Sequence, residues 1–161
     1  MRQYRHIVQY YETDRMGITH HSNYIRWMEE ARVHFLKEIG WSYKALEDIG
    51  VTSPVIGVEG TYKTSTTFDD EVSIEVSVKE IKGAKLILNY DMRKNTGEMV
   101  FQGISTHCFI NSEGRIIRLE REYPKIQIIV LYIYDHLLFH TNSRNTKDKH
   151  YFRKLIQYFY M

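Results

Sequence analysis

The sequence predicts an α+β domain in which an antiparallel sheet curls around one long helix. Apolar residues recur at spacings of three and four over residues 23–39, which is typical of a helix with one buried face. After Pro54 the period changes to strict alternation, as half-buried strands require. Turn-forming residues separate the alternating runs and favour hairpins over crossover connections. We therefore expect the helix to supply the apolar partner for one face of a meander.

The first elements are predicted in chain order. A β-rich run covers residues 6–12 and ends at the turn-like segment 13–17. The long helix follows over residues 23–39, with Ser22 expected to cap its start and Gly40 to end it. A shorter helix is expected over residues 42–48. The predicted buried stripe of the long helix comprises Tyr24, Trp27, Met28, Ala31, Phe35 and Ile39.

Three strands are predicted after the helices. Alternation is strict over residues 72–78 and again over residues 86–92. Residues 99–110 carry apolar side chains on both faces, which predicts a central strand covered on both sides. The connecting turns are expected at Lys82-Gly83, Asn95-Thr96-Gly97 and Asn111-Ser112-Glu113-Gly114.

Composition excludes several classes of protein. The formal net charge is +2, too balanced for a protein that mainly coats nucleic acid. Cys108 is the single cysteine, so no intramolecular disulfide can form, and its apolar surroundings predict a small buried side chain. The longest apolar run, residues 126–139, is shorter than the roughly 20 residues of a membrane-spanning helix. Without a secretory signal pattern at its start, the chain is expected in the cytoplasm.

The densest group of polar side chains, residues 12–24, lies in the loop that leads into the long helix. First-turn N–H groups of a helix lack internal partners and carry the positive end of its dipole. A carboxylate just upstream, such as Asp14, could attack a carbonyl polarised there, or activate water against it. This pattern indicates acyl transfer. On turn chemistry alone, Asp14 is more simply an Asx-turn residue.

Other candidate groups have simpler explanations. His20 and His21 are adjacent, do not share a face, and have no third ligand at a supporting spacing, so we expect no metal site. Ser22 lacks the surrounding glycines of a nucleophile elbow. His107, inside a strand pattern, is expected to be a packed or hydrogen-bonded side chain.

The loop and helix start together resemble a known signature, that of hotdog-fold acyl-CoA thioesterases. The branch is the 4-hydroxybenzoyl-CoA thioesterase type, which includes the bacterial enzymes encoded beside the Tol-Pal genes. Its pattern is a Thr-Asp or Cys-Asp pair, a glycine three residues later, an aromatic or His pair, Asn/Ser-Tyr, and a helix with Glu-x-Ala-Arg. The matching segments are Tyr11-Glu12-Thr13-Asp14-Arg15-Met16-Gly17-Ile18 and His21-Ser22-Asn23-Tyr24-Ile25-Arg26-Trp27-Met28-Glu29-Glu30-Ala31-Arg32. Weaker similarity extends to about Pro124.

The resemblance implies a hotdog fold and hydrolysis of acyl-CoA to free acid and CoA, without a cofactor. Asp14 matches the catalytic carboxylate, either nucleophile or general base. His21 matches the residue whose backbone N–H polarises the thioester carbonyl, and Gly17 a loop glycine near the thioester. Asn23 and Tyr24 match the pair that orients the loop. The family's active sites form between subunits, which implies a homodimer or homotetramer.

Two other functions fit a hotdog fold. A non-catalytic acyl-CoA or acyl-carrier-binding module would not need an acid at position 14, so Asp14 favours the enzyme. A hotdog dehydratase would show a different His and acid pattern, which we do not find. CoA phosphates would meet basic side chains on the hairpins, unless these are ordinary solvated charges. The candidates are Lys82, Lys85, Arg93 and Lys94.

The end of the chain departs from the family pattern. We predict a hotdog domain over residues 1–125 and an atypical extension over residues 126–161. The extension contains five Ile, five Tyr and three Phe but no Gly, Ala, Pro or Glu. It is interpreted as an extra helix docked on the sheet, a membrane or partner contact, or an out-of-frame extension of an AT-rich gene.

Overall fold

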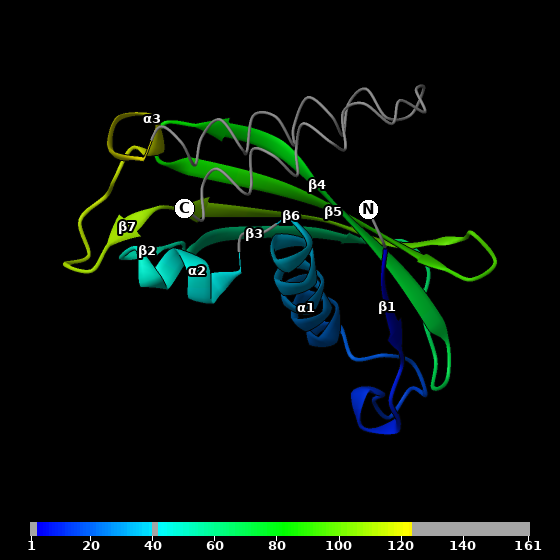
Figure 1. Ribbon diagram of the computed structural model, residues 1–161. Helices are drawn as coiled ribbons and strands as arrows, with labels where there is room; N and C mark the ends of the chain where they lie inside the picture. Colours follow the sequence, from blue (N-terminus) through cyan, green and yellow to red (C-terminus); the bar gives the residue numbers. More distant parts are fainter. Residues whose placement is uncertain (1–2, 40–41, 124–161) are drawn as a thin grey trace.

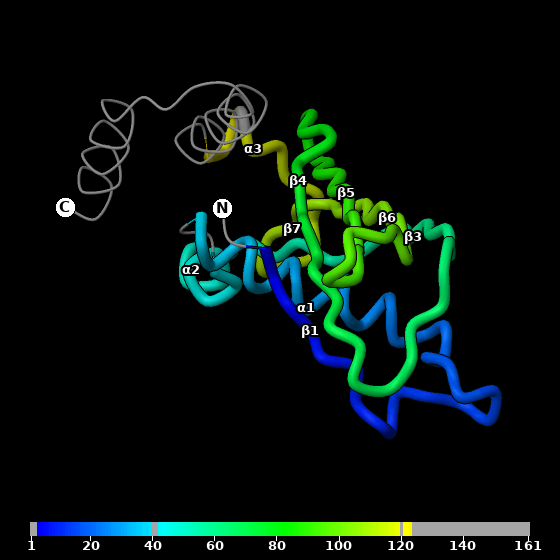
Figure 2. The backbone as a smooth tube through the Cα atoms, turned by 90° about the vertical axis from the view of Figure 1, so that its right-hand side faces the viewer, coloured from blue at the N-terminus to red at the C-terminus, as the bar shows by residue number. Residues whose placement is uncertain are grey.

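The computed structural model describes residues 3–39 and 42–123, which form a curved antiparallel sheet over one long helix (Figure 1). The main sheet has five strands in the order β1-β4-β5-β6-β3, and β2 pairs with β7 in a separate two-stranded sheet. Helix α1 lies along one face of the main sheet, as the view turned by 90° also shows (Figure 2). The elements are β1 (Tyr4–Ile7), the 3-10 helix η1 (Tyr10–Glu12), α1 (Ser22–Glu38), α2 (Tyr43–Asp48), β2 (Val51–Thr52), β3 (Val55–Tyr62), β4 (Glu71–Lys82), β5 (Lys85–Lys94), β6 (Met99–Cys108), β7 (Ile110–Asn111) and α3 (Leu119–Glu122).

Helix α1 confirms the predicted period, and every residue of the predicted stripe is buried. The prediction for its cap is wrong. Ser22 is already the first helical residue and His21 occupies the cap position, so the Ser22 hydroxyl is too far along the helix to cap it. Its Oγ instead lies 2.9 Å from Nδ1 of His20. Gly40, the predicted stop, lies outside the described residues.

The predicted strand over residues 6–12 is also wrong in its second half. Strand β1 ends at Ile7, and residues 10–12 turn into η1. The Glu12 side chain is the reason, because its carboxylate is turned inward and accepts the Gln9 N–H at 2.8 Å. An extended backbone would leave that N–H without this partner. The turn after β1 brings the next segment close to the start of α1.

The remaining predictions for secondary structure are largely confirmed. Helix α2 begins where Ser42 Oγ accepts the Ala45 N–H. The β4–β5 and β5–β6 hairpins turn at the predicted residues, and all pairs in the main sheet are antiparallel. Strand β6 is an interior strand, between β5 and β3, but it is not fully covered on both sides, since Gln102 is exposed on the face opposite Phe101. The apolar residues on both faces of the β6 sequence therefore led us to predict more burial of this strand than the structure shows.

No helix within residues 3–39 and 42–123 is long and apolar enough to cross a membrane. The extension 126–161 and the predicted boundary after residue 125 lie outside the described residues, and both stay predictions.

Candidate active site

The segment that carries Asp14 folds into a tight turn, here called the Asp14 turn (residues 13–19). The Asp14 N–H donates to the Ile18 carbonyl at 2.9 Å, and the Gly17 N–H donates to the Asp14 carbonyl at 2.9 Å. Thr13 and Thr19 pair as an antiparallel bridge at its base. Gly17 has a φ of +75°, a conformation that residues with a Cβ rarely adopt. Glycine is therefore required by the backbone of this turn.

The Asp14 carboxylate makes one hydrogen bond within the described chain. Its Oδ1 accepts the Met16 N–H at 2.8 Å, which is the Asx-type contact expected from turn chemistry. Oδ2 has no partner in residues 3–39 and 42–123. The side chain is half-buried. One oxygen thus fixes the orientation of the carboxylate and the other stays open for chemistry.

The Asp14 turn is tied directly to the start of α1. The Glu12 carbonyl accepts both the His20 N–H and the Asn23 Nδ2–H, each at 2.8 Å. The His21 N–H donates to no group in the part of the chain that the structure describes. Such an amide at the positive end of a helix can polarise a carbonyl oxygen. The structure therefore places a carboxylate turn next to a free helix-start amide.

A buried hydroxyl chain holds the second end of the Asp14 turn. Thr66 Oγ1 lies 2.7 Å from Thr19 Oγ1 and 2.9 Å from the Tyr24 hydroxyl. The Thr19 N–H also donates to the Thr66 carbonyl at 2.8 Å. The Tyr24 ring stacks on Phe101 of β6. The geometry thus puts Asn23 and Tyr24 where they can orient the turn, and their role stays a prediction.

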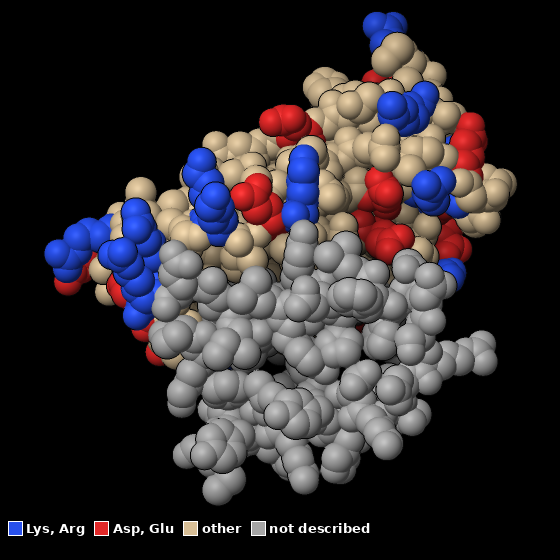
Figure 3. Space-filling view, turned by 90° about the horizontal axis from the view of Figure 1, so that it is seen from above, with Lys and Arg blue, Asp and Glu red and all other residues tan. Residues whose placement is uncertain are grey.

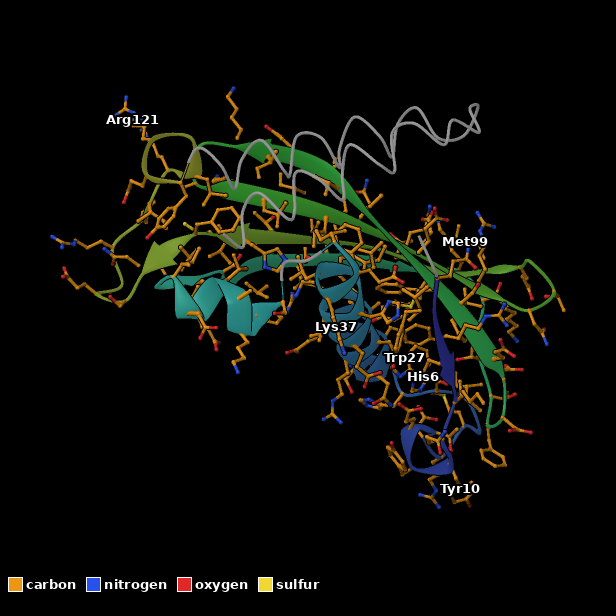
Figure 4. All side chains as sticks on the ribbon, in the orientation of Figure 1. His6, Tyr10, Trp27, Lys37, Met99 and Arg121 are labelled. Carbon is orange, nitrogen blue, oxygen red and sulfur yellow. The ribbon has the colours of Figure 1, made fainter. Side chains whose placement is uncertain are left out.

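Glu12 is a buried acid that the sequence did not single out. Its Oε1 accepts the Trp27 indole N–H at 2.8 Å, and its Oε2 lies 2.8 Å from Nε2 of His6. Burial alone would raise the pKa of Glu12, but hydrogen bonds from Gln9, His6 and Trp27 outweigh it and hold the pKa below its usual value. Figure 4 shows His6 and Trp27 side by side where β1 meets α1. A hydropathy pattern could not have predicted that Glu12 is buried, because the structure buries this charged residue and exposes its more apolar neighbours Tyr10 and Tyr11.

Tyr62, at the end of β3, is a second residue that the sequence missed. Its hydroxyl donates to the carbonyl of His21 at 3.0 Å, and its ring contacts those of Tyr24 and Phe101 edge-on. Tyr62 lies 41 positions from His21 in the chain, so only the fold brings them together. The cap residue of α1 is thereby linked to the edge strand of the sheet.

The four basic candidates for CoA phosphates do not meet. Lys82 and Lys85 flank the β4–β5 turn, whereas Arg93 and Lys94 lie at the other end of β5. Nine residues of extended strand span about 30 Å, so one phosphate group cannot contact both pairs. Lys94 also forms an ion pair with Asp70 at 3.0 Å. Figure 3 shows basic and acidic side chains interspersed over the visible part of the described surface.

The other polar candidates occupy structural positions. His107 is buried, and its Nε2 lies 2.7 Å from Ser105 Oγ, which confirms the prediction of a packed strand residue. Burial and the nearby Arg32 charge lower the pKa of His107 to about 4. Cys108 is buried, as predicted. Among the described residues, no group of three or more His, Cys, Asp or Glu side chains is placed to hold a metal ion.

A comparison with models of known protein families shows to which family this chain belongs. The family model described as the thioesterase-like superfamily matches residues 8–142. The chain belongs to the thioesterase-like superfamily. The match covers the Asp14 turn, α1 and every strand of the main sheet except β1, which ends at Ile7 just before it. Asp14 and His21 therefore lie inside the part shared with this superfamily.

Individual members of the thioesterase-like superfamily agree with this assignment. The chain is 30% identical to a putative acyl-CoA thioesterase of Bacillus subtilis, YneP, over 73% of this chain and 86% of that protein. It is 33% identical to a putative esterase of Aquifex aeolicus, over 76% of this chain and 94% of that one. A crystal structure of a DHNA-CoA thioesterase from Staphylococcus aureus superposes with a TM-score of 0.79 at 25% identity, over 89% of this chain and 96% of that one. The predicted hotdog fold is confirmed.

Proposed function

We propose that this protein is an acyl-CoA thioesterase, which hydrolyses acyl-CoA to a free carboxylic acid and CoA. The observation that carries the proposal is the Asp14 turn, held beside the free His21 amide at the start of α1. Membership of the thioesterase-like superfamily supports it, as do relatives named as acyl-CoA thioesterases. A thioester suits this small set of groups because its carbonyl is weakly conjugated and thiolate leaves readily.

The reaction needs a nucleophile and a site for the developing oxyanion. In one route the open Asp14 oxygen attacks the thioester carbon and expels CoA thiolate, leaving a mixed anhydride that water then hydrolyses. In the other route Asp14 takes a proton from water as the water oxygen attacks the thioester carbon directly, and the C–S bond then breaks to release the acid and CoA thiolate. Both routes place the carbonyl oxygen on the His21 N–H, which stabilises negative charge there. Gly17 keeps the backbone of the turn compact beside the thioester.

The relatives do not agree on the acyl group of the substrate. The Staphylococcus relative is named for DHNA-CoA and the Bacillus relative for acyl-CoA in general, so relatives differ in what their names say they act on. For the CoA end, Arg93 and Lys94 are the better candidates. They pair with Ser73 and Val72 near the start of β4, the same end of the sheet as the Asp14 turn, whereas Lys82 and Lys85 lie about 30 Å away.

We further propose that the protein assembles as a homodimer or homotetramer through β3. This edge strand has all eight residues exposed, including large apolar side chains at Val55, Ile56, Val58 and Tyr62. An unpaired apolar edge is a template for pairing with another strand. Because Tyr62 also bonds to His21, pairing at β3 would put the partner subunit next to the active site.

Thiol release tests the proposed activity. The purified chain is offered short-chain, long-chain and aromatic acyl-CoAs, and free CoA is followed with a thiol-reactive dye, while calorimetry measures binding of the same compounds. A thioesterase releases CoA from at least one class. Binding of acyl-CoA without any thiol release would instead establish the non-catalytic module.

Light scattering tests the assembly. Wild type is expected at two or four times the chain mass of 19.3 kDa. Val58→Lys puts a charge on the β3 edge and should shift the protein toward the monomer, with loss of activity. Ile116→Lys, a change at another exposed apolar residue, serves as the control and should leave the mass unchanged. A monomeric wild type with full activity would contradict the shared site.

A further inference from the structure

Glu12 joins three separate segments through one carboxylate. Oε2 accepts the Gln9 N–H of the turn before η1 and lies 2.8 Å from His6 of β1. Oε1 accepts the indole N–H of Trp27, on the buried face of α1. The side chain of Glu12 is only 6% exposed, so these contacts replace almost all of its water. An ionised carboxylate needs such donors when it is buried.

The backbone of Glu12 closes the Asp14 turn. Its carbonyl accepts the His20 N–H and the Asn23 side-chain N–H, both at 2.8 Å. The Asp14 turn therefore begins directly after Glu12, and the residue that follows the turn, His20, is hydrogen-bonded back to Glu12. Any movement of Glu12 is transmitted to Asp14, two residues later, and to the helix start. Glu12 is thus hydrogen-bonded both to the residue that follows the Asp14 turn and to the first turn of α1.

We infer that Glu12 is a positioning residue, which holds the Asp14 turn in register with the His21 amide through its contacts to Trp27, Gln9 and His6. Glu12 does not touch the substrate in this role and takes no part in proton transfer. The inference rests on the proposed thioesterase function and adds a residue to it. Displacement of a reacting group by about 1 Å can lower a rate by about a hundredfold, so a support of this kind has a catalytic effect.

Glutamine at position 12 tests the role of the two carboxylate oxygens. Its side-chain amide has one acceptor oxygen, so either the Trp27 N–H or the Gln9 N–H must face an NH2 group and lose its bond. Glu12→Gln should lower kcat by about tenfold to a hundredfold with KM within about threefold of wild type, because positioning affects the reacting groups more than binding. Hydrogen exchange of the amides in residues 13–21 should become faster than in wild type, which is a readout independent of activity.

Tyr90→Phe provides the matched control. The Tyr90 hydroxyl is buried and lies 2.8 Å from Ser105 Oγ, which in turn contacts His107. Within residues 3–39 and 42–123 this group forms no hydrogen bond with the Asp14 turn. The variant should lose stability but keep its kcat within about twofold and its exchange in residues 13–21 unchanged. Should Glu12→Gln fail to fold, Glu12→Asp keeps the charge but is too short to reach Trp27 and Gln9 together, and the same readouts apply.

The outcomes separate the two proposals. Lower kcat and faster exchange in the Glu12 variant, without these changes in Tyr90→Phe, support the inference. Unchanged kcat and exchange in a folded Glu12 variant overturn it while leaving the proposed function in place. If wild type releases no thiol from any acyl-CoA, the proposed function fails, and exchange in residues 13–21 alone decides whether Glu12 holds the turn.

Discussion

The replacement of Asp14 by asparagine is the most direct test of the active site. Asparagine has nearly the same shape and keeps a carbonyl oxygen in place of Oδ1, so the 2.8 Å bond from the Met16 N–H can persist. The variant removes the negative charge and the open carboxylate oxygen. It thus separates the chemistry of Asp14 from its role in the turn.

The size of the effect follows from these contacts. A positioned general base contributes about a hundredfold to ten-thousandfold in rate, so kcat of Asp14→Asn should fall by that range, equal to about 3 to 5 kcal/mol of activation free energy. Stability should change little, because Asp14 is half-buried and forms no ion pair within the described residues. We expect the melting temperature to stay within about 2 °C of wild type, since the Met16 N–H keeps a neutral acceptor.

The assay is thiol release from the best acyl-CoA substrate, measured at saturating substrate and beside a thermal melt. Asp48→Asn, at an exposed position of α2, is the matched control and should retain wild-type kcat. If Asp14→Asn retains full kcat, Asp14 is not the catalytic carboxylate. If activity and melting temperature fall together, the expectation that asparagine preserves the turn is refuted, because loss of the fold then explains the lost activity.

Three further predictions concern stability and the helix start. Because the pKa of His107 is lowered to about 4 in the folded protein, the unfolded chain binds the proton first as the pH falls. The contribution of His107 to the free energy of unfolding is therefore full above about pH 6.5 and declines by about 3 kcal/mol toward pH 4, and pH-dependent melts of a His107→Gln variant should lack this decline. Gly103→Ala should destabilise the fold by about 1 to 3 kcal/mol in denaturant titrations, because the added Cβ would lie 2.7 Å from a ring carbon of Phe101. Gly57→Ala, whose added Cβ would have its closest contact at 3.8 Å, should leave stability unchanged, and equal effects of the two substitutions would contradict the packing argument. Tyr62→Phe removes the hydrogen bond to the carbonyl of His21 at the helix cap and should lower kcat by about threefold to tenfold. Tyr10→Phe, at an exposed tyrosine, is the control, and an unchanged kcat in Tyr62→Phe would contradict the prediction.

Local patterns accounted for most of the fold. The three-four spacing of α1, the alternation of β4 and β5 and the turn residues between strands are properties of neighbouring residues, and the structure confirms them. The errors concern where elements begin and end. Inward rotation of Glu12 ended β1 early, and Ser22 lies one residue too late to act as the cap of α1.

The sequence by itself determined which residues form the Asp14 turn and the helix after it, because the motif, the turn glycine and the helix period lie within some thirty neighbouring residues. Only the tertiary structure decided how the site is supported. Glu12 is buried against Trp27, and the Tyr62 hydroxyl reaches the carbonyl of His21. Each of these depends on which distant segments pair in the sheet and against α1, and the side-chain period of one segment carries no information about its partner.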